Sequence, residues 1–399
     1  MVMTVTCSGI RRPGCFRHWS CCTRIWREPV LLTGLKDSRL PKTRQKNTVS
    51  RVSANLSTLN RYCFALFAHK IISPKTASFL TPNAKILIFS LLLKGAMFPW
   101  ESALTGSEVC PGEIYSDYEQ HIVGDIAFAV KQLWSTSGDQ QWLKSQAFPV
   151  IQATAEFWAN RAVYNDSKNG YVIYNVMPPD EDAEVVNNSA YTNMIAKMNL
   201  EFAYEVLPNA SDSWKTIAEH MYVPFDATNN YHPEYDGYRG NEVKQGDVIL
   251  LGFPLMVNTS LDVRRSDLSF YEPRTNPRGP AMTKSMFAIG WLDVGDYARA
   301  ETSFNESYVN AKAPFMVWTE GADGGGAVNF ITGAGGFLQS LLFGYGGLRL
   351  HGNHQLHFNP MLPPGATQMK FIGVDYHGNS INFVTGESQS QILGNLVKL

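Results

Sequence analysis

The sequence predicts a mainly α-helical protein that ends in a small antiparallel β unit. Apolar side chains recur at helical spacing in seven segments between residues 122 and 342, and long loops rich in Gly, Pro, Asn and aromatic residues separate these segments. The sequence shows no alternation of strands with helices. Many helices joined by long loops therefore indicate a helical toroid whose loops build a cleft at one end.

The first 85 residues differ in composition from the rest of the chain. They hold 15 Lys and Arg against only Glu28 and Asp37, whereas residues 86–399 hold 19 Lys and Arg against 33 Asp and Glu. Five of the six cysteines also lie in this segment, and no apolar periodicity runs through it. We expect residues 1–85 to be a basic, disordered segment. A nucleic-acid-binding arm is disfavoured, because the charges and aromatic residues follow no recognisable binding module.

Residues 86–347 carry the expected helices. In the first, Ile122, Ile126 and Val130 lie at helical spacing, and Ser137-Gly138 is a usual helix C-terminus. The remaining segments are 150–163, 191–206, 213–221, 281–291, 297–308 and 336–342.

Residues 348–399 are expected to form the β unit. After Gly344-Tyr345-Gly346-Gly347, apolar residues occur in short runs spaced by turns such as Pro363-Pro364-Gly365 and His377-Gly378-Asn379. This pattern is typical of antiparallel strands.

The turn Pro178-Pro179-Asp180-Glu181 is the most informative local segment. Proline fixes φ near −65°, and residues 171–174 upstream indicate a strand, so Glu181 is expected on a rigid loop where catalytic groups are commonly placed. Met177 and the prolines would hold the carboxyl group partly out of water, which disfavours its charged form and suits a general acid. The alternative is a surface turn with solvated Asp180 and Glu181.

Several motifs agree, in order over about residues 90–399, with glycoside hydrolase family 65. Besides the Pro-Pro-Asp-Glu turn, they are Gly95–Ala103 (GAMFPWESA), His121–Ala129 (HIVGDIAFA), Val186–Asn193 (VNNSAYTN), Lys244–Asp247 (KQGD) and Trp318–Gly321 (WTEG), followed by the glycine-rich stretch 324–336. This resemblance implies an (α/α)6 barrel with a C-terminal β-domain, and hydrolysis of an α-glucosidic bond with inversion. No cofactor is implied.

The resemblance also implies roles for individual residues. Glu181 matches the general acid of the family, and Glu320 matches the carboxylate that activates water. Lys244 and Gln245 match a pair that binds sugar hydroxyls, and Trp100 with Glu101 matches the wall of the glucose site. An indole face suits the apolar side of a sugar ring, and Lys and Gln donate hydrogen bonds to hydroxyls.

Two other kinds of site are disfavoured. His351, His354 and His357 alternate between the two faces of an expected strand and therefore do not share one metal ion. The glycine-rich stretches Gly324–Gly326 and Gly333–Gly336 lack the continuation of a phosphate loop, so we interpret them as close backbone approach at the floor of the cleft.

The expected substrate is the glucosyl-galactosyl-hydroxylysine of collagen-type proteins. The alternatives are a trehalose-type disaccharide, phosphorolysis instead of hydrolysis, or an inactive or glycan-binding remnant. The last arises because residues 1–85 resemble neither the N-terminal β-domain nor the early barrel helices of the family, which suggests a truncated chain or a wrongly assigned gene start. No signal peptide is visible, and the apolar run Ile86–Leu93 is too short to cross a bilayer, so we expect no membrane partner. The compartment stays open, with a lean towards the cytoplasm.

Overall fold

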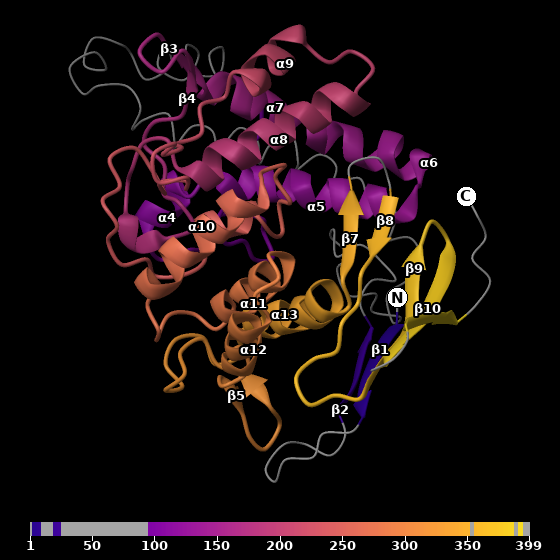
Figure 1. The fold of residues 1–399 in the computed structure, drawn as a ribbon. Helices are drawn as coiled ribbons and strands as arrows, with labels where there is room; N and C mark the ends of the chain where they lie inside the picture. The colour runs from indigo at the N-terminus through magenta and orange to yellow at the C-terminus, as the bar shows by residue number, and fades with distance from the viewer. Residues whose placement is uncertain (1, 9–18, 25–94, 352–354, 387–389, 394–399) are drawn as a thin grey trace.

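The computed structural model describes residues 2–8, 19–24, 95–351, 355–386 and 390–393, and it is mainly helical with small antiparallel sheets (Figure 1). The expected run Ile86–Leu93 lies outside these residues. The α-helices are α4 Glu113–Tyr118, α5 His121–Ser137, α6 Gln140–Trp142, α7 Phe148–Arg161, α8 Ala190–Val206, α9 Asp212–Glu219, α10 Leu261–Tyr271, α11 Thr283–Asp293, α12 Tyr297–Glu306 and α13 Ile331–Gln339. Shorter turns are the π-helices η1 Leu143–Ala147 and η5 Ser340–Tyr345, and the 3₁₀-helices η2 Glu181–Ala183, η3 Val248–Leu251 and η4 Glu272–Arg274.

All seven helices expected from apolar periodicity are present. Helix α5 ends where the sequence indicates, because Gly138 takes a left-handed conformation with φ of 66°. Helix α7 begins at Phe148 and places Pro149 in its first turn, where a missing N–H costs no helical hydrogen bond. The last helix begins earlier than expected, at Ile331, and continues as η5.

Helix α10 was not expected from the sequence. Its buried side chains are Val263, Asp267, Leu268 and Tyr271, so a polar residue interrupts the apolar face. Asp267 is tolerated there because its carboxylate accepts the backbone N–H of His232 at 2.8 Å and pairs with the His232 ring at 2.9 Å.

Two apolar cores hold the loops between the helices. The first lies among α5, α7, α8 and α9 and includes Ile173 and Val176 from the loop that follows strand β4 (Gly170–Val172). The second lies among α8, α10 and α11 and includes Val243, Val248 and Ile249 from the loop before and within η3. Full burial of such a side chain contributes about 1.5–3 kcal/mol, so both loops are fixed by packing on the helices.

The C-terminal β unit is antiparallel, as expected, but its strands divide between two sheets. Strands β7 Leu348–His351 and β8 Gln355–Phe358 form a hairpin of their own. Strands β9 Gln368–Tyr376, β10 Asn379–Gly386 and β11 Ser390–Leu393 are consecutive neighbours in a five-stranded sheet. Two short hairpins lie within the helical part, one of β3 Val163–Asn165 with β4 and one of β5 Ala311–Lys312 with β6 Val317–Trp318.

The other two strands of the large sheet come from the basic segment 1–85. The sheet order is β11-β10-β9-β1-β2, with β1 Val2–Ser8 antiparallel to β9 and Val5 opposite Phe371 (Figure 1). Strand β2 Trp19–Arg24 forms the far edge. The expectation of disorder is therefore wrong for these two strands. No periodic signal was found in the sequence for these two strands.

Helix α5 joins the helical part to the β unit. The turn between β9 and β10 contacts its C-terminal end, where the His377 backbone N–H donates to Thr136 O at 2.8 Å and His377 Nε2 lies 3.0 Å from Ser135 O. Across the described ranges, no helix is long and apolar enough to cross a membrane.

Candidate active site

The Pro-Pro turn packs inside the protein. Residues 176–180 are all buried, so the alternative of a solvated surface turn is wrong for Asp180. The Asp180 carboxylate accepts the backbone N–H of Asp182 at 3.3 Å and thereby caps η2, of which Glu181 is the first residue.

Glu181 forms an ion pair with Lys244. Lys244 Nζ contacts Glu181 Oε2, and the side chains of Lys244 and Glu181 are 26% and 15% exposed. Burial lowers the pKa of Lys244, but its hydrogen bond and charge interaction with Glu181 raise the pKa by more, so it lies above the ordinary value. The Lys244 ammonium group therefore lies directly against the Glu181 carboxyl group.

Gln245 binds the same turn from the other side. Its Nε2 donates to Pro179 O, and Gln245 itself is buried. The next residue, Gly246, donates its backbone N–H to Thr283 Oγ1 at 3.0 Å, which ties the loop to helix α11. The structure thus places Lys244 against Glu181 and Gln245 against Pro179 of the same turn.

Three buried carboxyl groups lie behind this contact. Asp180, Glu234 and Asp247 are 2%, 0% and 2% exposed. Asp180 Oδ1 accepts the Lys244 backbone N–H at 2.8 Å, and Asp247 Oδ2 accepts the Asp180 backbone N–H at 2.9 Å. The Asp180 and Asp247 carboxyl groups therefore brace both halves of the Glu181–Lys244 pair.

Trp100 and Glu101, expected together at the glucose site, separate in the structure. Both backbone N–H groups donate to the Glu108 carboxylate, at 2.6 and 3.1 Å, but the Glu101 side chain is exposed. Trp100 is half-buried and meets the His121 ring edge-on, with 6.3 Å between ring centroids. Trp100 therefore turns towards the interior cluster and Glu101 towards solvent.

His121 is the centre of a buried ionic group. Its Nδ1 lies 2.7 Å from Asp125 Oδ2, and its Nε2 lies 3.3 Å from Glu119 Oε1, while Tyr191 donates its hydroxyl to Asp125 Oδ1 at 2.7 Å. Burial lowers the pKa of His121, but Asp125 and then Glu119 outweigh it and raise the pKa to about 10. Burial raises the pKa of Glu119, and His121 opposes that change. The charge of Glu119 also acts on Glu181 and Lys244, so this cluster borders the acid turn.

Glu320 follows β6 and is held by backbone groups. Its Oε2 accepts the Ala327 N–H at 2.8 Å, and its backbone N–H and C=O bond to Ala327 and Ala281. Gly326 has φ of 70°, and a Cβ there would overlap Oε2 of Glu320. The close backbone approach expected for the glycine-rich stretch is therefore present at Gly326. The Glu320 C=O accepts the Ala281 N–H, and Thr283, two residues later, accepts the Gly246 N–H. These hydrogen bonds link Glu320 to the loop that contacts the acid turn.

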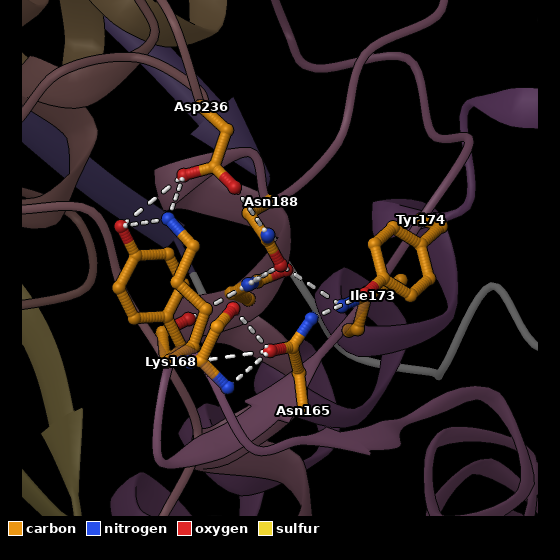
Figure 2. Close-up of polar contacts among 9 residues, drawn as sticks. Asn165, Lys168, Ile173, Tyr174, Asn188 and Asp236 are labelled. Carbon is orange, nitrogen blue, oxygen red and sulfur yellow. Dashed lines mark hydrogen bonds and ion pairs between the residues drawn. The ribbon is translucent and has the colours of Figure 1, made fainter.

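The segment after the acid turn is fixed by a polar network (Figure 2). Asn188 Oδ1 accepts the Ile173 backbone N–H at 3.0 Å and Asn193 Nδ2 at 3.1 Å, while Asn188 Nδ2 donates to Asp236 Oδ2 at 2.8 Å. Lys168 Nζ pairs with the other oxygen of Asp236 at 2.8 Å. The Asn188 amide thus links the chain before Glu181 to the chain after it, together with the Val176–Val186 backbone bridge and the Asn175 N–H bond to Asn187 Oδ1.

Sequence reasoning missed Glu119, Asp180, Glu234 and Asp247 as parts of this centre. Asp247 stood in a quoted motif, and its place beside Lys244 was the available signal. Glu234 lies in the long loop between α9 and α10, and no sequence signal pointed to it.

In the described part of the chain, no group of three or more His, Cys, Asp or Glu is arranged to hold a metal ion. His354 lies outside the described residues. The His351 and His357 rings lie 4.2 Å apart on one hairpin.

The geometry gathers a carboxyl group, an ammonium group and an amide at one turn, and such groups can bind hydroxyls. A family model described as the glycosyl hydrolase family 65 central catalytic domain matches residues 82–243, a range that includes Trp100 and Glu181 and ends one residue before Lys244. Protein-glucosylgalactosylhydroxylysine glucosidase of Gallus gallus is 46% identical over 305 residues, which are 75% of this chain and 43% of that protein. The protein of the same name from Dictyostelium discoideum is 46% identical over 72% of this chain and 41% of its own length.

Kojibiose hydrolase of Mucilaginibacter mallensis is 37% identical over 73% of this chain and 44% of its own length. The chain thus spans less than half the length of these curated relatives. A solved structure named for kojibiose phosphorylase, from the human microbiome, superposes with a TM-score of 0.64 at 18% identity, over 75% of this chain and 49% of its own, and shows a shared fold. Residues 82–243 of this chain are therefore similar to the central catalytic domain of glycosyl hydrolase family 65.

Proposed function

We propose that this chain carries the catalytic centre of an inverting α-glucosidase that removes glucose from glucosyl-galactosyl-hydroxylysine. The observation that carries the proposal is the contact of Lys244 with Glu181 and of Gln245 with Pro179 of the same turn. These contacts bring a carboxyl group close to two hydrogen-bond donors of the kind that bind sugar hydroxyls. The names and identities of the Gallus gallus and Dictyostelium discoideum relatives support the substrate.

The proposed architecture is a partial (α/α)6 barrel over residues 86–347 with a β-domain over 348–399. The mainly helical fold and the similarity to the kojibiose phosphorylase structure support the barrel. The direct contacts among loops far apart in sequence, at 176–184 and 243–247, support one shared loop face as the active centre.

In the proposed mechanism, the sugar hydroxyls take over donors of Lys244 and Gln245. Lys244 then no longer neutralises Glu181, so Glu181 can hold a proton and give it to the glycosidic oxygen as the bond to the anomeric carbon breaks. Glu320 takes a proton from water, whose oxygen attacks the anomeric carbon from the opposite face and inverts it. Lys244 would therefore couple the binding of sugar to the protonation of Glu181.

Phosphorolysis, the competing reaction, is disfavoured by Glu320. Two like unit charges 4 Å apart repel by about 4 kcal/mol at an effective dielectric constant of 20. A phosphate dianion has two charges, so its repulsion from the Glu320 carboxylate at this distance would be larger. A trehalose-type substrate remains the second candidate, because a fungal cell wall acid trehalase, from Arthroderma benhamiae, is 30% identical over 80% of this chain.

The test compares Glu181→Gln and Glu320→Gln with the matched variant Glu184→Gln, whose carboxylate is exposed on the same turn. We expect the first two to lower glucose release from glucosyl-galactosyl-hydroxylysine by about 10²–10⁴-fold, and Glu184→Gln to leave it within about threefold. Glu181→Gln should spare α-glucosyl fluoride, whose leaving group needs no proton.

Polarimetry of the released glucose checks inversion. Wild-type rates in Glu181→Gln or Glu320→Gln would overturn the assignment of that residue. Trehalose cleavage without cleavage of the collagen-type glucoside would replace the substrate. A wild-type chain that binds the glucoside and releases no glucose would favour a glycan-binding relative over an enzyme.

A further inference from the structure

Behind the acid turn, three carboxyl groups share a buried site. Asp180, Glu234 and Asp247 are all at least 98% buried, and no cation is among the groups that act most strongly on Glu234. Burying even one unpaired carboxylate costs several kcal/mol, so three ionised groups in contact are not a stable arrangement. At least one proton must therefore reside in the cluster.

The hydrogen bonds show where that proton belongs. Asp180 Oδ1 already accepts two backbone N–H groups, from Lys244 and Asp182, and Asp247 Oδ2 accepts the Asp180 backbone N–H. These bonds suit ionised acceptors. Neither oxygen of Glu234 receives an N–H or a hydroxyl from the described part of the chain, and the Asp180 carboxyl group lies within hydrogen-bonding reach of the Glu234 carboxyl group. A bond between two carboxyl groups requires a proton on one of them.

The electrostatics agree with this geometry. Burial, followed by the charges of Asp247 and Asp180, raises the pKa of Glu234 to about 11. Burial also raises the pKa of Asp180, against the hydrogen bonds from the Lys244 and Asp182 backbones, and raises the pKa of Asp247 to about 7, so Glu234 holds its proton more tightly than Asp247 does. The other titratable groups that act on this cluster are His121, whose charge lowers the pKa of Asp247, Asp182, whose charge raises the pKa of Asp180, and several phenols. Burial and then Glu234 raise the pKa of Tyr238, and likewise of Tyr271, so both stay neutral.

We propose that Glu234 is a protonated positioning residue, whose carboxylic acid donates a hydrogen bond to the Asp180 carboxylate and so fixes the turn that carries Glu181. Asp180 transmits the effect, because it bonds to the Lys244 backbone on one side and precedes Glu181 on the other. Glu234 touches neither the sugar nor the proton that is transferred. The inference rests on the proposed function of Glu181 as the acid.

The experiment compares Glu234→Gln, which keeps a neutral donor, with Glu234→Leu, which keeps the approximate volume and loses the donor. We expect Glu234→Gln to stay within about threefold of wild type on every substrate. Glu234→Leu should lose about 10²-fold in kcat on the unactivated glucoside and no more than about threefold on α-glucosyl fluoride, because only the first needs a placed acid. Glu181→Gln is the reference for a pure defect in acid catalysis.

A second measurement does not depend on activity or on the folding of Glu234→Leu. The infrared difference spectrum between wild type and Glu234→Gln at neutral pH should contain the carbonyl stretch of a protonated carboxylic acid. Its absence would overturn the proposal, as would equal losses of Glu234→Leu on both substrates, which indicate a merely structural role. Full activity of Glu181→Gln on the unactivated glucoside would instead refute the proposed function and leave the infrared result to decide the protonation of Glu234.

Discussion

The two predicted catalytic carboxylates are held by opposite means. The turn of Glu181 is buried and braced by side chains, namely Asp180, Lys244 and Gln245, together with the carboxyl groups behind them. The loop of Glu320 is braced by backbone groups, and glycine at position 326 lets the chain close over the carboxylate. The first arrangement depends on protonation states and the second on backbone conformation. The two regions should therefore fail under different perturbations.

The largest difference is expected in the response to pH. Burial and neighbouring carboxyl groups raise the pKa of Glu234 to about 11, so the folded state keeps a proton that the unfolded state releases above its ordinary value of about 4.3. The stability contributed by this proton is fully present at low pH and falls by about 1.4 kcal/mol per pH unit between about pH 5 and 10. Glu234→Gln removes this slope. Urea unfolding at pH 6, 7 and 8 should therefore show the variant gaining about 3 kcal/mol on wild type.

Glu205→Gln, on the exposed face of α8, is the matched control and should run parallel to wild type at all three pH values. Parallel curves for Glu234→Gln as well would mean that Glu234 carries no extra proton in the folded state. The acid turn would then be held by packing alone, and the contrast with the Glu320 loop would weaken.

The Glu320 loop should instead respond to a single methyl group. Gly326→Ala places a Cβ against Glu320 Oε2, whereas Gly324→Ala, at φ of 93° in the same loop, places one in open space. Both substitutions strain a left-handed residue by about 1–3 kcal/mol, but only the first displaces the carboxylate. We expect glucose release to fall at least about tenfold further in Gly326→Ala. Equal losses in the two variants would mean that backbone strain alone matters.

The smallest expected effect lies at the end of the acid turn. Glu184 is exposed and has φ of 56° and ψ of −123°, a conformation that glycine adopts readily and other residues do not. Glu184→Gly should raise the free energy of unfolding by up to about 1 kcal/mol. Glu201→Gly, inside helix α8, should lower it by about the same amount. Destabilisation by both in thermal unfolding would show that the strain at Glu184 is offset by contacts of its side chain.

The helices and the antiparallel β unit could be predicted because each shows its own periodicity. Helix α10 escaped prediction because Asp267 lies on its buried face, and the pairing partner, His232, is 35 residues away. Strands β1 and β2 escaped prediction because β1 obtains its place by pairing across the whole chain with β9, and β2 by pairing with β1.

For the candidate site, sequence motifs supplied Glu181, Lys244 and Gln245, and the structure places Lys244 and Gln245 on the turn that carries Glu181. The separation of Trp100 from Glu101 was out of reach, because it depends on the ring of His121. The protonated neighbour Glu234 was also out of reach, since carboxyl clustering arises only when distant loops are packed together. The roles of Glu181, Glu320, Lys244, Gln245, Trp100 and Glu101 remain predictions.

The contact of His377 with the end of α5 bears on the modularity of this protein. A helix leaves its last carbonyls without internal partners, and here the turn between β9 and β10 provides donors for two of them. The other end of α5, about 25 Å away along 17 residues, is His121 beneath the acid turn. The boundary proposed between residues 347 and 348 therefore separates two kinds of secondary structure, but the two parts still depend on each other through the contact at α5. If the helical part were grafted onto another scaffold, the C-terminal carbonyls of α5 would need new hydrogen-bond donors. Without them the helix would become less ordered, and His121 at its first residue would be less firmly placed.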